Sequence, residues 1–285
     1  MSIPYNPKEV VGPHTSSYNF VKAISDYAQK FHAASVYVCW DDGIPARRLE
    51  LYPAYKQNRK VAKEKDRARH EDFGRNREFL KGCLYLAGVR SIQQRGFEAD
   101  DIIYGLAKVL QGHRVVIVSA DMDLAQLITG TVCQQRPGKD LLTEATLGSV
   151  VLDDHYDVRP VHADDIPVFK ALRGDPGDGI SPICRPRNVS AIWESLRRKN
   201  LPITIQNVRS VASDLGVVIG PELEAIYSVV NLNCSGVAAD AIEIAMQEVS
   251  KIARPSEEDF VQVFVDVGMN PGYVRAIFHP FMFLA

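Results

Sequence analysis

The sequence predicts an α/β fold with a mostly parallel sheet and helices on both of its faces, followed by an α-helical domain. Short β-branched segments alternate with amphipathic segments as far as about residue 160, and only helical periodicity follows. We therefore expect an α/β domain over residues 1–160, with a charged helical arm at about 55–87, and a helical domain over 161–285. With 285 residues, 46% of them hydrophobic, the chain can bury a substantial core.

The strands are predicted by short runs of β-branched and aromatic residues that end in turn-forming residues. The run at 35–40 is closed by Asp41, Asp42 and Gly43, and the run at 114–119 is the clearest in the chain. The expected strands are 35–40, 89–93, 114–119 and 131–135.

The helices are predicted by apolar residues that recur on one face at helical spacing. In residues 17–33, for example, Phe20, Ile24 and Phe31 fall on one face. The expected helices of the first domain are 17–33, 55–87, 98–110 and 121–128. Those of the second are 166–172, 189–198, 203–215, 221–230, 237–252 and 257–267.

Several classes of protein are excluded by simple features. The longest apolar runs hold a handful of residues, far short of the roughly 20 that cross a bilayer. The first residues are Pro-rich and contain Lys8 and Glu9 instead of an apolar core, so we expect no secretory signal and a cytoplasmic protein. The five cysteines lie 44 to 51 residues apart without a CxxC pair, which indicates reduced thiols.

The net charge of −2 conceals a segregation of charge along the chain. Residues 44–81 contain 12 Lys and Arg against 6 Asp and Glu, and residues 185–209 contain 6 against 1. Such basic islands can bind a polyanion locally, although solvated helix faces are an equally good explanation of the charge alone.

Acidic residues follow successive predicted strands. Because the carboxyl ends of parallel strands meet at one edge of a sheet, these side chains are expected to converge there. Packed carboxylates repel one another, so the cluster is best explained as a cage for two Mg²⁺ ions, with Mn²⁺ as a substitute, that hydrolyses phosphodiesters. Taken singly, the same acids could be helix caps or turn residues. The acids after strands are Asp41, Glu98, Asp100, Asp101, Asp121 and Asp123, and a further pair in the 174–179 turn of the helical domain, Asp175 and Asp178, completes the set of eight.

Basic residues follow Asp41 directly in the sequence and predict a cationic helix beside the acidic edge. Lys and Arg there could hold phosphates, and Tyr55 could stack on an unpaired base. The alternative is a solvated helix with Tyr55 packed inward. The basic residues include Arg47, Arg48, Lys56, Arg59, Lys60, Lys63, Lys65, Arg67 and Arg69.

Five ordered motifs between about residues 14 and 180 resemble the flap endonuclease and 5′→3′ exonuclease family, most closely its bacteriophage ribonuclease H and 5′-exonuclease branch. They are Trp40-Asp41-Asp42-Gly43 to Arg48, the run Leu51 to Arg59, Phe97-Glu98-Ala99-Asp100-Asp101, the run Ser119 to Leu127, and Gly174-Asp175-Pro176-Gly177-Asp178. The resemblance implies a PIN-like nuclease domain and a helix–three-turn–helix motif that grips duplex DNA.

The resemblance also implies roles for single residues. The first metal would be held by Asp41, Glu98, Asp100, Asp101 and Asp121, and the second by Asp121, Asp123, Asp175 and Asp178. Lys56 and Arg59 match positions that contact the reacting phosphate, with Arg48 supporting them. Lys60 and Lys63 extend the nucleic-acid-binding arm.

Two departures from the family pattern stand out. The turn at Asp178 lacks the second glycine pair of the family's hairpin, which leaves its potassium ion open, and Arg185 and Arg187 could replace the backbone cradle with side-chain phosphate contacts. Family members also begin with a strand that ends in an Asp ligand, whereas residues 1–16 carry Glu9 as their only acid. A late start codon, a split gene or weakened catalysis would each explain this.

The function we expect is a metal-dependent 5′-nuclease, a monomer that removes RNA primers or flaps from DNA or RNA–DNA hybrids in phage-type replication. The alternative is a catalytically impaired protein of the same fold that binds 5′ junctions without cutting. A PIN-type ribonuclease is disfavoured by the helical second domain. The aromatic C-terminal end could dock a single-stranded-DNA-binding protein, although we favour its packing on the chain's own helices.

Overall fold

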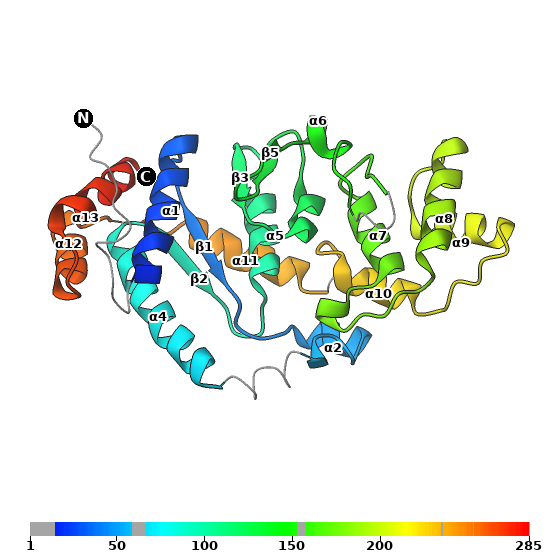
Figure 1. Cartoon of the computed structure of the whole chain (residues 1–285), viewed down its shortest axis with the longest axis horizontal. Coiled ribbons are helices and arrows are strands. Elements are labelled where there is room, and N and C mark those ends of the chain that lie inside the picture. Colours follow the sequence, from blue (N-terminus) through cyan, green and yellow to red (C-terminus); the bar gives the residue numbers. More distant parts are fainter. Residues whose placement is uncertain (1–14, 59–66, 153–157, 235, 253, 285) are drawn as a thin grey trace. The chain divides into compact units, whose positions relative to one another are not determined.

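The computed structural model describes residues 15–58, 67–152, 158–234, 236–252 and 254–284 (Figure 1). Contacts between segments divide the chain into two compact units, each assembled from pieces that are separate in the sequence. Unit 1 comprises residues 1–40, 63–92 and 250–285, and unit 2 comprises residues 41–62 and 93–249.

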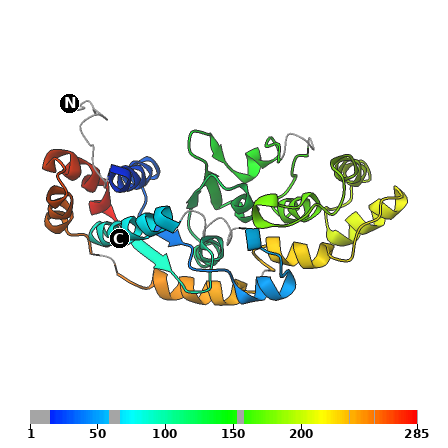
Figure 2. The same cartoon turned by 60° about the horizontal axis from the view of Figure 1, so that its bottom comes forward.

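Unit 1 is a helical assembly around a two-stranded sheet. Its elements are α1 (Thr15–Phe31), β1 (Tyr37–Trp40), α4 (Arg67–Leu86), β2 (Arg90–Gln93), α12 (Glu257–Asp266), α13 (Pro271–Phe278) and the 3₁₀ helix η3 (His279–Phe283). Strands β1 and β2 pair, and α12 lies beside α13 in both views (Figures 1 and 2). Phe260, Phe264 and Phe281 are fully buried in the core, so the aromatic end of the chain packs largely on its own helices.

Unit 2 contains the second sheet and most of the helices. Its elements are α2 (Ala46–Leu51), α5 (Ala99–Val109), β3 (Val115–Val118), η1 (Met122–Leu127), β4 (Val132–Gln135), β5 (Leu141–Leu142), α6 (Glu144–Leu147), α7 (Asp165–Arg173), η2 (Pro176–Asp178), α8 (Pro186–Arg198), α9 (Ile205–Asp214), α10 (Leu223–Val230) and α11 (Ala238–Val249). Every described element from residue 165 onward is helical, as predicted. A domain boundary near residue 160 stays a prediction.

The sheet of unit 2 contains three described strands, and the alternation of residues in β3 explains which face packs on the helices. β3 pairs with β4 in parallel, with Val115 opposite Val132, and β4 pairs with β5 in the antiparallel sense. Ile117 and Val132 pack with Tyr104 of α5 and Ala241 of α11 in one apolar cluster. Period-two alternation in β3 therefore directs one face of the sheet toward these two helices.

The predicted α/β class is confirmed, but the single, mostly parallel sheet was wrong in its extent. The described strands form two small sheets of two and three strands. Each of these described strands is only two to four residues long.

Two helix predictions also needed correction. Tyr55 and Lys56 lie in a turn and not in a helix, because the Lys56 amide donates to the Asp178 carbonyl and Lys56 has a positive φ of 54°. Residues 122–127 form a 3₁₀ helix, which Asp121 caps by accepting a hydrogen bond from the Asp123 amide two residues on. The short helix α2 was not predicted.

Candidate active site

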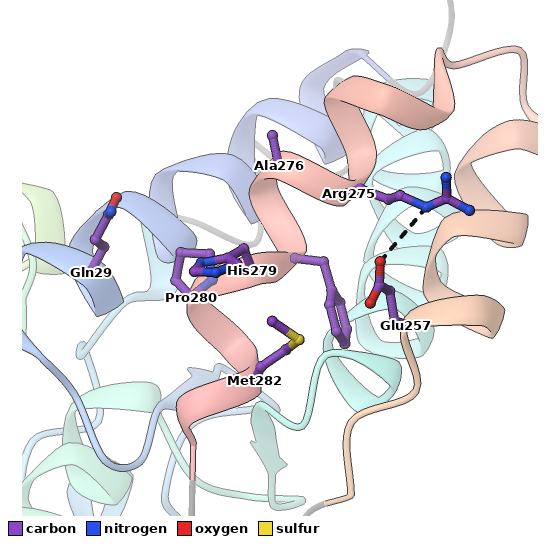
Figure 3. Close-up of a pocket in the computed structure, with 8 residues that line it drawn as sticks. Gln29, Glu257, Arg275, Ala276, His279, Pro280 and Met282 are labelled. Atoms are coloured by element: carbon purple, nitrogen blue, oxygen red, sulfur yellow. Dashed lines mark ion pairs between the residues drawn. The ribbon is translucent and has the colours of Figure 1, made fainter. Parts of the chain in front are cut away.

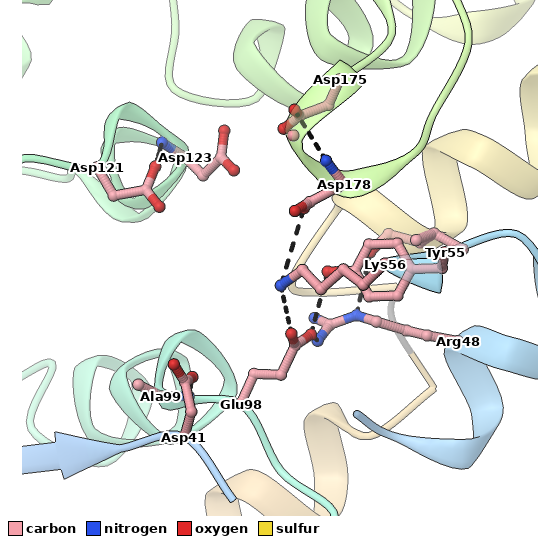
Figure 4. Close-up of polar contacts among 12 residues, drawn as sticks. Asp41, Arg48, Tyr55, Lys56, Glu98, Ala99, Asp121, Asp123, Asp175 and Asp178 are labelled. Atoms are coloured by element: carbon pink, nitrogen blue, oxygen red, sulfur yellow. Dashed lines mark hydrogen bonds and ion pairs between the residues drawn. The ribbon is translucent and has the colours of Figure 1, made fainter. Parts of the chain in front are cut away.

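Carboxylates from four segments of unit 2 face one another around a common space (Figure 4). Asp41 follows β1, Glu98 caps α5, and Asp121 and Asp123 open η1. Asp175 precedes η2, and Asp178 is the last residue of η2. The sequence therefore placed these side chains correctly relative to the ends of strands and helices. A narrow cleft in this region is lined by Arg48, Tyr55, Asp100, Asp123, Lys170 and Asp178, among others.

The start of α5 is fixed by reciprocal hydrogen bonds. Glu98 and Asp101 form a capping box, in which the Glu98 amide donates to Asp101 Oδ2 at 3.2 Å. The Ala99 amide donates to Asp41 Oδ1 at 2.8 Å. These bonds satisfy free amides of the first helical turn, so Asp41 and the start of α5 hold each other in place.

The loop that carries Asp121 is fixed by hydrogen bonds from a buried glutamine of β4. Gln134 Nε2 donates to the Asp121 carbonyl at 2.6 Å and to the Ser119 carbonyl at 3.1 Å. The Asp123 amide donates to Asp121 Oδ1 at 2.9 Å. Asp121 itself is exposed and Asp123 half-buried.

The turn at residues 174–179 needs both of its outer glycines. Gly174 and Gly179 have φ of 73°, and a Cβ at Gly179 would lie 2.9 Å from the Ala54 carbonyl oxygen. The close approach exists because this turn docks on residues 54–58. The Lys56 amide donates to the Asp178 carbonyl at 2.7 Å, and Asn58 Nδ2 donates to the Pro176 carbonyl at 3.0 Å.

Buried cations already neutralise several of the acids. Arg48, only 2% exposed, forms a two-pronged pair with Asp101, with NH1 at 2.9 Å and NH2 at 2.7 Å, and also donates to Glu98. Its Nε donates to the Val229 carbonyl at 3.2 Å. With these bonds, Arg48 organises the start of α5 rather than presenting its guanidinium to solvent.

Lys56 and Tyr55 complete this side of the site. The Lys56 ammonium donates to Glu98 and lies 3.8 Å from Asp178 Oδ2, and the Tyr55 hydroxyl donates to Glu98 at 3.1 Å. Burial, followed by the charge of Glu98, raises the pKa of Tyr55. Tyr55 is buried among apolar residues, so it packs inward here as the alternative interpretation expected.

Lys170 is a buried cation that sequence reasoning missed. Its ammonium contacts Asp123 and lies 3.0 Å from Asp175 Oδ2. Burial would raise the pKa of Asp175, but the ion pair with Lys170 outweighs it and holds that pKa below its usual value. The available signal was a lysine five residues before Asp175, in a helical stretch whose other residues from Ile166 to Leu172 are apolar.

Asp100 differs from these paired acids. Within the described ranges, no lysine, arginine or histidine forms an ion pair with Asp41, Asp100 or Asp121. Burial, reinforced by the charges of Asp121 and Asp123, raises the pKa of Asp100 to about 7. This side of the site therefore carries negative charge that would be stabilised by a cation.

The donor set fits a hard divalent cation, because carboxylate oxygens are the ligands that Mg²⁺ and Mn²⁺ prefer. Across the described part of the chain, no three acidic, histidine or cysteine side chains already converge closely enough to hold an ion. Ion pairs explain much of this spacing, because five of the eight acids are paired with Arg48, Lys56 or Lys170 and not directed at a common ion. Metal binding would thus require some of these pairs to rearrange.

The remaining predicted residues lie elsewhere. Arg185 and Arg187 are exposed at the start of α8, where Arg185 is the N-cap residue. They are not part of the carboxylate cluster. Arg59, Lys60 and Lys63 lie outside the described residues.

A separate pocket in unit 1, with a volume of about 410 Å³, lies among α1, α12, α13 and η3 (Figure 3). Its one carboxylate, Glu257, faces Arg275 at 3.7 Å. Phe278 forms part of its wall, while Met282 at its rim is 47% exposed. This pocket lacks the grouped acids that define the candidate active site.

No helix in the described ranges has the length and apolar character needed to cross a membrane.

The fold and the acids together define the class of a nuclease domain of the resolvase-like type. A family model described as the 5′-3′ exonuclease N-terminal resolvase-like domain matches residues 5–153, and the chain belongs to this family. The thermostable DNA polymerase I of Thermus thermophilus is 31% identical over 207 residues, which cover 69% of this chain and 23% of that protein. The matched part of the chain thus spans less than a quarter of that relative's length.

Solved structures have the same fold. A bacteriophage T5 flap endonuclease in a complex with DNA and metal ions matches 87% of this chain and 90% of its own, with a TM-score of 0.59 and 21% identity. The catalytic core of Rad2 with a DNA substrate matches 96% of this chain and 87% of its own, with a TM-score of 0.53 and 11% identity. The expected family and fold class are therefore confirmed.

Proposed function

We propose that the chain is a divalent-metal-dependent 5′-nuclease that hydrolyses phosphodiesters at 5′ ends or flaps of DNA and RNA–DNA hybrids, as in the removal of RNA primers. The observation that carries the proposal is the convergence of carboxylates from four distant segments on one space that also holds buried cations (Figure 4). Family membership and the DNA and metal ions named for the T5 relative support it.

The acids divide into two proposed ligand groups. Asp41, Asp100 and Asp121, together with Glu98 and Asp101, would hold a first Mg²⁺, and Asp121, Asp123, Asp175 and Asp178 a second, with Mn²⁺ as a substitute. When bound, such ions activate water and neutralise charge on the phosphate. Asp101 is engaged by both prongs of Arg48, so its main contribution would be to orient Glu98 and the start of α5.

The protein's own cations would act on the phosphate and on the acids. Lys56 faces the carboxylates from a turn and would contact the reacting phosphate, together with Arg59. Arg48 is a positioning residue, because its donors are occupied by Asp101, Glu98 and the Val229 carbonyl. Lys60 and Lys63 would continue the contact with nucleic acid along the arm.

Arg185 and Arg187 would bind duplex phosphates. Both are exposed at the start of α8, where helix amides and arginine side chains together favour an anion. Reversal of both charges, R185E with R187E, should weaken duplex binding and reduce its salt dependence by about one unit of slope per lost contact. The matched control is R275E in unit 1, and equal salt dependence in all three proteins would contradict this assignment.

The test of the proposed function is cleavage of a 5′-labelled RNA–DNA hybrid and a 5′-flap DNA, first with Mg²⁺ and then with Mn²⁺. We expect cleavage that EDTA and Asp121→Ala abolish, whereas Asp214→Ala, which removes an exposed acid on α9 paired with Lys199, leaves it intact. Junction binding without turnover in either metal would instead favour a catalytically impaired binding protein. Cleavage that persists in EDTA would refute the metal dependence.

A further inference from the structure

The last residues of α10 and the first residues of its connection to α11 bond to Arg48, Tyr104 and Gln126 beside the candidate site. This segment, Val229 to Asn233, is called here the 229–233 junction. None of its residues is acidic or basic, and none belongs to the five motifs. Val229, Val230 and Leu232 nevertheless line the same narrow cleft as Asp100 and Asp123. The hydrogen bonds of this junction therefore bear directly on where the acids lie.

The first link joins the junction to the α5 side of the site. Arg48 Nε donates to the Val229 carbonyl at 3.2 Å, and the same guanidinium holds Asp101 and Glu98. The Tyr104 hydroxyl of α5 donates to Asn233 Oδ1 at 2.6 Å. Both bonds constrain the helix whose first turn carries Asp100.

The second link joins the junction to η1 through Gln126. Its Nε2 donates to the Asp123 carbonyl at 2.8 Å and to the Val230 carbonyl at 3.3 Å, while its Oε1 accepts from the Leu232 amide at 2.9 Å. A single side chain thus spans from the backbone of one candidate ligand to two residues of the junction. Such a three-bond bridge fixes the direction in which η1 presents its acids.

The junction is itself rigidly built. Asn231 is 9% exposed, its Nδ2 donates to the Tyr227 hydroxyl at 2.8 Å, and its Oδ1 accepts from the Asn233 amide at 2.9 Å. Leu232 packs in the apolar cluster that holds Tyr104 and Leu124. A rigid junction can transmit the position of α5 to η1, whereas a loosely held loop could not.

We infer that the 229–233 junction sets the separation between the two acid-bearing elements α5 and η1, and that Gln126 is the positioning residue through which it acts. The inference rests on the proposed function in one respect: the separation of α5 and η1 matters because a divalent cation would bind between Asp100 and Asp121. Gln126 touches neither the cation nor the nucleic acid in this role.

The test measures the dissociation constant of Mn²⁺ for the full chain without substrate. Electron paramagnetic resonance monitors the binding. Gln126→Met keeps the length of the side chain but removes all three hydrogen bonds, and we expect Mn²⁺ affinity to fall on the order of ten-fold. The matched control is Gln135→Met on β4. It removes the bonds from Nε2 to the carbonyls of Arg136 (2.8 Å) and Lys139 (2.7 Å), which belong to a turn outside the site.

Both variants should lose some thermal stability, but only Gln126→Met should lose Mn²⁺ affinity. Cleavage by Gln126→Met should recover as the Mn²⁺ concentration rises, which a loss of folded protein would not allow. Should this variant fail to fold, Tyr104→Phe removes only the bond to Asn233 and should weaken Mn²⁺ binding in the same direction.

Unchanged Mn²⁺ affinity in folded Gln126→Met, or an equal loss in the Gln135→Met control, would overturn the inference. If Gln126→Met does not fold, unchanged affinity in Tyr104→Phe would do the same. A wild-type chain that binds Mn²⁺ and shows the expected difference but cleaves neither substrate would overturn the proposed function alone. A wild-type chain that binds no Mn²⁺ would overturn both the inference and the metal dependence.

Discussion

Arg48 and Asp101 face each other in a buried two-pronged ion pair, with both guanidinium nitrogens within 2.9 Å of a carboxylate oxygen. The two residues are separated by 53 positions in the sequence and lie in different motifs. Planar pairing of this kind fixes orientation as well as distance. The pair therefore fixes the distance and orientation of α2 relative to the start of α5, beside the acids.

Loss of the Arg48 charge should strongly reduce the stability of the fold. Arg48→Met leaves Asp101 and Glu98 buried without their cation, and the free energy of unfolding should fall by about 3–5 kcal/mol. Arg47→Met is the matched control, because its exposed pair with Glu50 at 2.9 Å contributes at most about 1 kcal/mol. Urea denaturation of both variants without divalent metal checks the difference, and equal losses would show that the buried pair is not a structural requirement.

The carboxylate of Asp100 should destabilise the fold without metal and contribute to its stabilisation when a divalent metal is bound. In the metal-free chain its charge is buried near Asp121 and Asp123, so Asp100→Asn should stabilise the fold by on the order of 1 kcal/mol or more. With Mg²⁺ or Mn²⁺ present, the same change removes a ligand and should reduce the stabilisation that the ion provides.

Thermal melting with and without Mg²⁺ measures both effects of Asp100→Asn. Asp240→Asn serves as the control, since it removes an acid at the start of α11. A lower melting temperature in metal-free Asp100→Asn would contradict the electrostatic argument. An Mg²⁺-induced shift as large as that of the wild type would remove Asp100 from the ligand set.

The placement of six of the eight acids was predictable because they follow a strand or open a helix with a clear sequence pattern, whereas Asp175 and Asp178 lie in a turn. Asp121 after the Val-Val-Ile-Val strand is the simplest case, and the structure places it where the pattern indicated. Lys170 was not predictable in the same way. Its role depends on the packing of α7 beside η1, which brings together residues 47 positions apart.

The turn at Lys56 shows a second limit of sequence reasoning. The charge pattern of residues 55–87 is that of one long helix, but Lys56 adopts a positive φ because its amide bonds to the Asp178 carbonyl. A contact between residues 122 positions apart thus overrides local helical propensity. The Gln126 bridge escaped prediction for the same reason, since its partners at 230 and 232 are distant in the sequence.

The docking of the 174–179 turn on Ala54 should be sensitive to one added methyl group. Gly179→Ala combines an unfavourable positive φ with a contact of 2.9 Å to the Ala54 carbonyl oxygen. Gly216→Ala is the matched control, because Gly216 also has a positive φ, of 67°, but its Cβ would meet nothing within 4 Å.

The φ penalty alone should cost about 1 kcal/mol in both glycine variants. Gly179→Ala should lose a further 1–3 kcal/mol, roughly, through overpacking. It should also reduce cleavage more than junction binding, because the turn orients Lys56 and Asp178. Denaturation and steady-state kinetics check these points, and indistinguishable stabilities would argue against a tight contact at Ala54.

Gly105 provides the most direct test of how α5 is positioned. A Cβ at Gly105 would lie 2.1 Å from the carbonyl oxygen of Ala241 and 2.6 Å from its carbon, so α5 and α11 cross with their backbones in close contact. Gly105→Ala must therefore push the helices apart and should cost about 1–3 kcal/mol. Because α5 carries Asp100 and Asp101 in its first turn, the shift should also lower Mn²⁺ affinity.

Gly82→Ala on α4 is the matched control, since its Cβ would meet nothing within 4 Å. There the substitution should stabilise the chain by about 0.5–1 kcal/mol, because alanine loses less backbone entropy in a helix than glycine does. Chemical denaturation and Mn²⁺ titration of the two variants give opposite expected signs for stability. A neutral Gly105→Ala would mean that the α5–α11 crossing can relax without moving the acids, and the position of α5 would then depend on its other contacts, those with Asp41, Arg48 and the 229–233 junction.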